Sequence, residues 1–196
     1  MESIVKKRSI VFAFVVLFAI ALTNCKEGDG QADYGFGVIY IPQATFTGLD
    51  NTFPVPGGGG PNTYNYKVDN SGGKLNIILG VLRAGKIADA GGFTVDVLVS
   101  TGETNEAIAS GEIRNAEALP SSMYTMDNKV TVEAGKNSAS FYLSVDINQL
   151  LDGANEGKNL VLAVAIANPT DFELSETNTS VVVIIDVEAM RSIIRP

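Results

Sequence analysis

The feature that most constrains the fold of this chain is a series of short runs in which apolar and polar residues alternate. In Phe93–Val99 the odd-numbered residues are all apolar, and Ser138–Ile147 repeats this pattern. Successive side chains of a strand point to opposite faces, so each run predicts a strand with one face in a core and the other towards water. Further strands are predicted at Gly37–Ile41, Tyr64–Val68, Leu75–Leu82, Lys129–Glu133, Leu160–Ala167 and Ser180–Val187.

About eight strands with a turn signal every ~8–12 residues predict an all-β fold, an antiparallel β-sandwich. The helical patterns that a parallel sheet requires between its strands are missing. Asn105–Asn115 is the one segment that favours a helix, and its Gly111 limits this helix to a turn or two. Thr47–Pro61 is predicted to be a long loop. Its four consecutive glycines lack the Lys-Ser/Thr that follows a phosphate-binding loop.

The N-terminal segment predicts an export signal. Lys6, Lys7 and Arg8 precede Ile10–Leu22, an uninterrupted apolar run of 13 residues. A membrane-spanning helix needs about 20 apolar residues, whereas this length is typical of the apolar part of a signal peptide. We therefore expect residues 1–24 to be a signal-peptide helix. A buried core helix or a short membrane span is the alternative.

Cys25 is the only cysteine of the chain and lies directly after this segment. A lone cysteine cannot form an internal disulfide. Its position resembles the lipobox of bacterial lipoproteins, although Asn24 stands where a small residue is usual. We expect Cys25 to carry a lipid anchor, residues 25–36 to form a flexible tether and residues 37–190 to form a single domain. The alternative for Cys25 is a small buried apolar residue.

Charge and composition exclude several classes of function. Residues 1–24 hold three of the 14 Lys and Arg and one of the 22 Asp and Glu, which leaves 11 against 21 and a net charge of −10. This charge disfavours binding to nucleic acid phosphates. The chain has no His, which excludes a Ser-His-Asp or Cys-His catalytic arrangement and the usual zinc sites. We expect no metal, no cofactor and no enzymatic activity.

Several segments after Phe93 together resemble a known family. They are Phe93–Val97, Ala118–Tyr124 with its Leu-Pro and Tyr, Val130–Gly135 with Val-Thr-Val and Ala-Gly, and the strands Phe141–Ile147 and Leu160–Ala167. The set resembles a Bacteroidetes surface-lipoprotein domain of unknown function, found ahead of some family-18 glycoside hydrolases and in glycan-binding lipoproteins. The resemblance implies an immunoglobulin-like β-sandwich at the cell surface, in a system that uses glycans, and it implies no catalytic site.

Candidate ligand-binding residues are few because the chain has no Trp. Tyr64 and Tyr66 share a strand face by their spacing, and Asn65 lies beside them, so these three residues are a candidate sugar platform. Packing against the sheet is the alternative. The predicted function is a non-catalytic, lipid-anchored module of the outer membrane that binds or displays glycans or contacts outer-membrane proteins. The alternative is a fimbrillin- or adhesin-like subunit that assembles by strand donation, for which Ser180–Val187 is the candidate donor.

Overall fold

A computed structural model describes residues 37–45, 51–57, 65–85 and 91–194, which belong to one compact unit that spans Tyr34–Pro196. The predicted signal peptide, Cys25 and the tether lie outside the described residues. No helix among the described residues is long and apolar enough to span a membrane.

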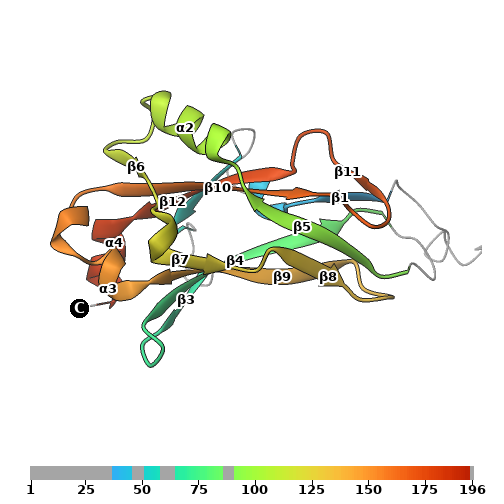
Figure 1. Cartoon of the computed structure of the whole chain (residues 1–196), viewed down its shortest axis with the longest axis horizontal. Helices are drawn as coiled ribbons and strands as arrows, with labels where there is room; N and C mark the ends of the chain where they lie inside the picture. Colours follow the sequence, from blue (N-terminus) through green and yellow to red (C-terminus); the bar gives the residue numbers. More distant parts are fainter. Residues whose placement is uncertain (1–36, 46–50, 58–64, 86–90, 195–196) are drawn as a thin grey trace, which may run out of the picture. The chain divides into compact units, whose positions relative to one another are not determined.

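Two six-stranded sheets pack against each other with the apolar core between them (Figure 1). The first sheet has the order β11-β1-β4-β9-β7, with β3 also beside β4, and the second has the order β2-β12-β10-β5-β8, with β6 also beside β10. The first sheet consists of β1 (Val38–Tyr40), β3 (Tyr66–Asp69), β4 (Lys74–Arg83), β7 (Tyr124–Met126), β9 (Ser138–Asp146) and β11 (Glu173–Leu174). The second consists of β2 (Thr52–Val55), β5 (Phe93–Val99), β6 (Ala116–Ala118), β8 (Lys129–Val132), β10 (Asn159–Ala167) and β12 (Ser180–Asp186).

The architecture confirms the predicted β-sandwich. Most strand pairs are antiparallel, as expected, and three short strands pair in parallel instead: β11 with β1, β6 with β10 and β2 with β12. The odd-numbered residues of β5 from Phe93 to Val97 are buried, as the alternation predicts. Val99 is 39% exposed although it belongs to the same face. The core-facing residues of β9 are buried or half-buried as predicted.

Helices cover one outer face and one end of the sandwich. They are α2 (Thr101–Ala109), α3 (Ile147–Leu150), α4 (Val187–Ile194) and the short 3-10 turns η2 (Pro42–Thr45), η3 (Ser121–Met123) and η4 (Gly153–Asn155). Figure 1 shows α2 over the outer face of the second sheet, and α3 and α4 at one end of the sandwich. The α4 helix follows β12 directly, with the Asp186 carboxylate accepting from the Ala189 N–H, and it buries Met190 in the core.

The α2 helix explains why β10 is buried on both faces. Val161 and Ala163 of β10 and Val182 of β12 form a second apolar cluster on the outer face, against which Ala107 and Ile108 pack. The edge of β10 is shared by β5 and β6, and Ala163 lies in the gap between them. The Ala163 carbonyl accepts from the Ser100 N–H at 2.9 Å, and its N–H donates to the Thr104 hydroxyl at 2.9 Å. The α2 helix thus satisfies the backbone groups that no strand reaches.

One stretch of chain changes sheets between β7 and β8. The β7 strand pairs with β9 of the first sheet, and after Asp127 and Asn128 the chain continues as β8, which pairs with β5 of the second sheet. The register of β8 ends at Asp96 of β5. The last residues of β5 therefore have β10 on one side and no strand of the described chain on the other.

The structure differs from what the sequence indicated at four places. Thr47–Pro61 contains the strand β2, and Pro54 is tolerated there because β2 is an edge strand. The helix predicted at Asn105–Asn115 begins earlier, because the Ser100 hydroxyl accepts from the Glu103 N–H and caps it. The sequence pattern also missed α4. Finally, β12 lies between β10 and β2, so it is an inner strand whose donation would open the sheet.

Candidate functional site

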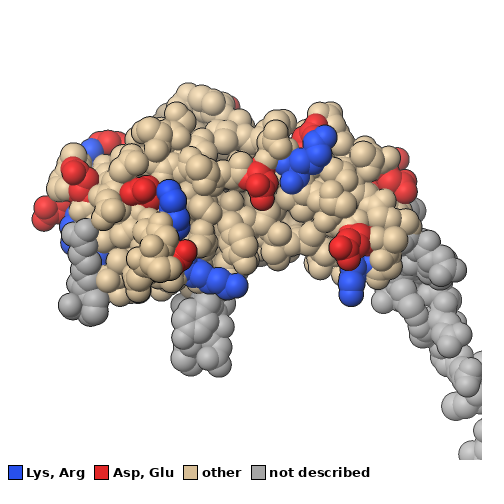
Figure 2. Space-filling model, turned by 60° about the horizontal axis from the view of Figure 1, so that its bottom comes forward, with Lys and Arg blue, Asp and Glu red and all other residues tan. Residues whose placement is uncertain are grey.

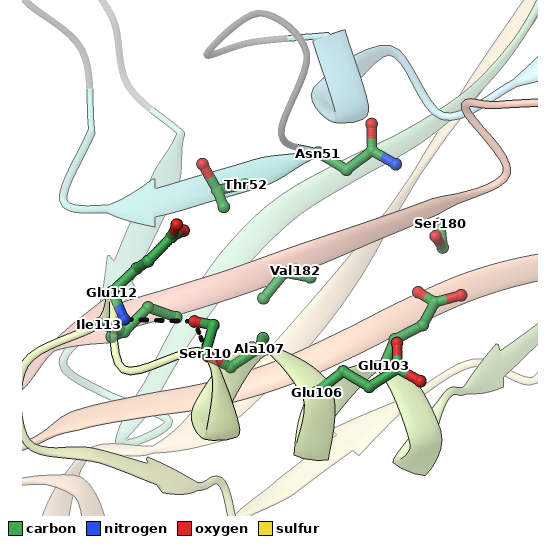
Figure 3. A pocket seen from close by; sticks show the side chains of 10 residues that line it. All are labelled: Asn51, Thr52, Glu103, Glu106, Ala107, Ser110, Glu112, Ile113, Ser180 and Val182. Atoms are coloured by element: carbon green, nitrogen blue, oxygen red, sulfur yellow. Dashed lines mark hydrogen bonds between the residues drawn. The ribbon is translucent and has the colours of Figure 1, made fainter.

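A hollow of about 360 Å³ lies between α2 and the strands β2 and β12. We call it the α2 groove; it is lined by Asn51, Thr52, Glu103, Glu106, Ala107, Ser110, Glu112, Ile113, Ser180 and Val182. Figure 3 shows that these side chains come from α2 and the loop after it on one side, and from β12 and the start of β2 on the other. Its size lies at the lower end of the range of small-molecule sites, about 300–1,000 Å³.

The floor of the α2 groove is apolar and is continuous with the second apolar cluster. Val182 is 9% exposed and belongs to that cluster, and Ala107 and Ile113 are half-buried against it. The walls are polar, with three carboxylates, hydroxyl groups and one amide. An apolar floor between hydrogen-bonding walls suits a ligand that has both apolar and hydroxylated faces, as sugar rings have.

The carboxylates are held by the geometry of α2. Glu103 and Glu106 are one turn apart, which places them on the same side of the helix. The buried hydroxyl of Thr104 donates to the Ser100 carbonyl at 2.8 Å while it accepts from Ala163. Thr104 thereby fastens the first turn of α2 to β10, so the groove has a fixed wall.

The turn after α2 positions the third carboxylate. Gly111 adopts a φ of 73°, a left-handed conformation that glycine tolerates without strain. The Ser110 hydroxyl donates to the Ala107 carbonyl and accepts from the Glu112 N–H (Figure 3). On the opposite wall, the Asn51 amide donates to the Thr177 carbonyl at 3.2 Å. Three segments that are distant in the sequence therefore meet in this groove.

The α2 groove presents hydrogen-bond acceptors and no cationic group, because none of the residues that line it is Lys or Arg. Within the described part of the chain, no group of three or more Cys, Asp and Glu side chains has the arrangement of a metal site. On the face of the molecule shown in Figure 2, basic side chains are scattered, and many of them lie beside acidic ones. The four ion pairs of the described residues all lie outside the groove.

A second hollow, of about 430 Å³, lies where the chain passes from β7 in one sheet to β8 in the other. We call it the β5–β7 seam; it is lined by Val97, Leu98, Val99, Tyr124, Thr125, Met126, Asp127 and Asn128. The Val97 N–H donates to the Asn128 carbonyl at 2.9 Å, so the backbone groups of the next odd residue, Val99, also point away from β10. The β5–β7 seam therefore combines apolar side chains with an open strand edge.

Shifted pKa values occur outside the α2 groove. Hydrogen bonds from Asn168 and Lys129 lower the pKa of Asp96 below 3.8. Hydrogen bonds from Ser71 and Gly72 lower the pKa of Asp69, which closes the turn between β3 and β4. Burial raises the pKa of Tyr124 in the β5–β7 seam. Each shift has a local structural cause.

The structure describes two of the three residues of the predicted sugar platform, Asn65 and Tyr66. Asn65 is 6% exposed, and its amide donates to the Pro54 carbonyl at 2.7 Å while its oxygen accepts from the Gly57 N–H. Asn65 therefore joins the end of β2 to the start of β3. Tyr66 is half-buried against the core, and Tyr64 lies outside the described residues. Ligand binding by these three residues stays a prediction, and the sequence analysis did not identify the α2 groove.

Another feature that the sequence did not reveal is the buried Arg83. Its side chain is 4% exposed, and its guanidinium lies 4.7 Å from the centre of the Phe172 ring. Phe172 in turn meets Phe93 edge to face at 5.6 Å. Arg83 thus belongs to the packing at the end of β4.

The sequence of the chain matches one protein-family model. A family model described as "-like, N-terminal domain" matches residues 39–173. This match covers more than half of the chain, so the chain belongs to that N-terminal-domain family. The sequence resemblance to a Bacteroidetes domain of unknown function is thereby confirmed, and a solved structure from Bacteroides ovatus has the same fold. No curated protein matches the chain.

Three similar solved structures come from Bacteroides. A protein of unknown function from Bacteroides ovatus is 14% identical, with 76% of this chain and 45% of that chain covered and a TM-score of 0.50, which supports the fold. A candidate carbohydrate binding protein from Bacteroides ovatus is 11% identical, with 69% and 34% covered and a TM-score of 0.43. An auxiliary nutrient binding protein from Bacteroides thetaiotaomicron is 15% identical, with 62% and 41% covered and a TM-score of 0.45. The chain spans between about a third and a half of the length of these proteins.

Proposed function

We propose that this protein is a non-catalytic module that binds or displays glycans in a polysaccharide-utilisation system, and that the α2 groove is its binding site. The observation that carries the proposal is the lining of this groove, in which three carboxylates, hydroxyls and an amide surround an apolar floor. Carboxylates accept hydrogen bonds from sugar hydroxyls, and such charge-assisted bonds are the strong ones in proteins. The names of two similar Bacteroides proteins, for carbohydrate and nutrient binding, agree with it.

The test uses the full chain, purified in detergent, against a panel of neutral polysaccharides: laminarin, α-mannan, galactan and xylan. We expect at least one to bind, and Glu103→Ala with Glu106→Ala to weaken that binding at least tenfold. A hydrogen bond to a charged group contributes about 1.5–3 kcal/mol, and about 1.4 kcal/mol is tenfold in affinity. Ser180→Trp, which fills the groove without removing a carboxylate, is expected to abolish binding.

The matched control is Glu133→Ala with Glu156→Ala, which removes two exposed carboxylates away from the groove. If the control weakens binding as much as the groove variant does, the cause is a general effect of charge. That result would contradict the proposal. Tyr64→Ala with Tyr66→Ala belongs in the same series. Loss of binding in that variant alone would place the glycan on the predicted tyrosine platform instead.

The location proposed for this module is the cell surface, through a lipid on Cys25. This proposal is supported by the basic residues, the apolar run and the single cysteine at the start of the chain. A diacylglyceryl group supplies two acyl chains, enough for a stable anchor. Metabolic labelling with an alkynyl fatty acid is expected to mark the wild type and not Cys25→Ala. Protease treatment of intact cells then distinguishes the outer from the periplasmic face.

A structural subunit that assembles by strand addition is the second candidate. The observation that favours it is the β5–β7 seam, where the edge of β5 beside Val99 has no strand of the described chain next to it. Strand addition uses such open edges. Because β12 is an inner strand, the donor would have to be another segment. Ladders of protease-trimmed polymer would support this candidate, and monomers at all concentrations would exclude it.

A further inference from the structure

The charges around the α2 groove are of one sign. Glu103 and Glu106 lie one turn apart on α2, and Glu112 follows in the next loop. None of the three carboxylates forms an ion pair with a Lys or Arg among the described residues, whereas Glu117 and Glu188 each do. A ligand in the groove therefore meets three negative charges, none of which is ion-paired to a Lys or Arg of the described residues.

Like charges repel, so negative charges that line a groove raise the free energy of an anion bound there. A carboxylate that a sugar carried into the groove would be repelled by the glutamates that line it, and it would also lose part of its hydration. A neutral hydroxyl in the same place would instead donate a hydrogen bond to a glutamate. The same three residues thus attract one class of sugar and repel another, which is how binding sites gain specificity.

We infer that the α2 groove selects uncharged sugars and rejects uronic acids and sulfated sugars, and that Glu103, Glu106 and Glu112 determine this selectivity. The inference rests on the proposed glycan-binding function and names the class of ligand for it. The apolar floor at Val182 contributes to binding of both classes. Selectivity therefore depends on the charge of the walls and is separable from binding itself.

The test compares each neutral glycan with a charged form of the same glycan. Laminarin, α-mannan and galactan are each oxidised at C6, which changes only a primary hydroxyl into a carboxylate. We expect the full wild-type chain to bind a neutral form at least tenfold more tightly than its oxidised form at low salt. The difference is expected to shrink as salt is added, because salt screens exposed charges.

The decisive variant is Glu103→Gln, Glu106→Gln and Glu112→Gln together, which removes the charges and keeps hydrogen-bonding side chains of similar size. We expect its affinities for the neutral and the oxidised forms to lie within about threefold of each other, where a tenfold difference corresponds to about 1.4 kcal/mol. The matched control changes three exposed glutamates away from the groove to Gln and alters the net charge equally. These control positions are Glu133, Glu156 and Glu173.

Three results would overturn the inference, and they are distinguishable. If the wild type binds an oxidised glycan as tightly as the neutral one, the selectivity is absent while the glycan-binding function stands. If no glycan of either form binds, the proposed function fails and the inference fails with it. Equal gains of oxidised-glycan binding in the control and the groove variant would also overturn it, because the net charge of the molecule would then be the cause.

Discussion

The α2 groove and the β5–β7 seam are hollows of similar size, about 360 and 430 Å³, that arise for different reasons. The groove forms where a helix lies over a complete sheet, so its floor is an ordinary outer face and its walls are polar. The seam forms where the chain passes from one sheet to the other between β7 and β8, and it leaves core-facing residues of β5 uncovered. The comparison teaches that exposed apolar residues can result from topology alone, whereas three carboxylates around an apolar floor require side chains from several segments.

The largest expected effect is on stability, and it differs between the covered part of β5 at Val97 and the uncovered part at Val99. Val97 is 3% exposed and Val99 is 39% exposed, although both are on the core-facing side. We expect Val97→Asp to cost about 4 kcal/mol or more, because it buries an unpaired carboxylate. Val99→Asp is expected to cost less than about 1 kcal/mol, because its carboxylate stays hydrated. Urea denaturation measures both, and equal losses would show that the seam is closed in solution.

The second prediction concerns the attachment of α2. Thr104→Val removes the hydroxyl that accepts from the buried Ala163 N–H, and an unsatisfied buried donor costs about 1–3 kcal/mol. We expect this loss of stability together with faster amide hydrogen exchange across α2 and weaker glycan binding. Thr101→Val, at an exposed position of the same helix, is the control. Unchanged exchange in α2 would mean that Thr104 does not hold the wall of the groove.

A smaller effect is expected for Leu98→Ser in the β5–β7 seam. Leu98 is 48% exposed, so its replacement loses only part of the ~1.5–3 kcal/mol of a fully buried side chain. We expect a stability change of about 1 kcal/mol or less and unchanged glycan affinity. A loss of glycan binding in this variant, measured by affinity electrophoresis, would reverse the roles assigned to the two hollows.

The smallest effect concerns the ion pair just before the seam. Asp96 accepts from Asn168 at 2.9 Å and pairs with Lys129 at 3.1 Å, and these contacts hold its pKa below 3.8. A carboxyl whose pKa is lowered on folding stabilises the protein above the unfolded-state value, and this contribution is lost as the pH falls through the folded-state pKa. We expect the melting temperatures of wild type and Asp96→Asn to differ slightly at pH 7 and to converge as the pH falls below 3.8. A difference that grew on acidification would contradict this linkage.

Much of the fold could be predicted from local patterns. The alternation in Phe93–Val99 and Ser138–Ile147 identified the strands and their core faces, because side-chain direction in a strand depends only on position. The β2 strand was missed, because its Pro54 is typical of a loop and only its place at a sheet edge allows it. The α2 helix was placed too late and made too short, because its Ser100 cap precedes the residues that favour a helix.

What the sequence by itself determined is the class of fold, the faces of the longer strands and the residues from which a site can be built. The tertiary structure alone decided where the proposed site lies. Asn51, the α2 glutamates and Val182 meet because β2 pairs with β12 and because Thr104 fastens α2 to β10. Likewise, only the burial of Asn65 between two backbone groups shows that its amide holds the chain together. Periodicity is a local property, whereas a groove depends on contacts between segments that are distant in the chain.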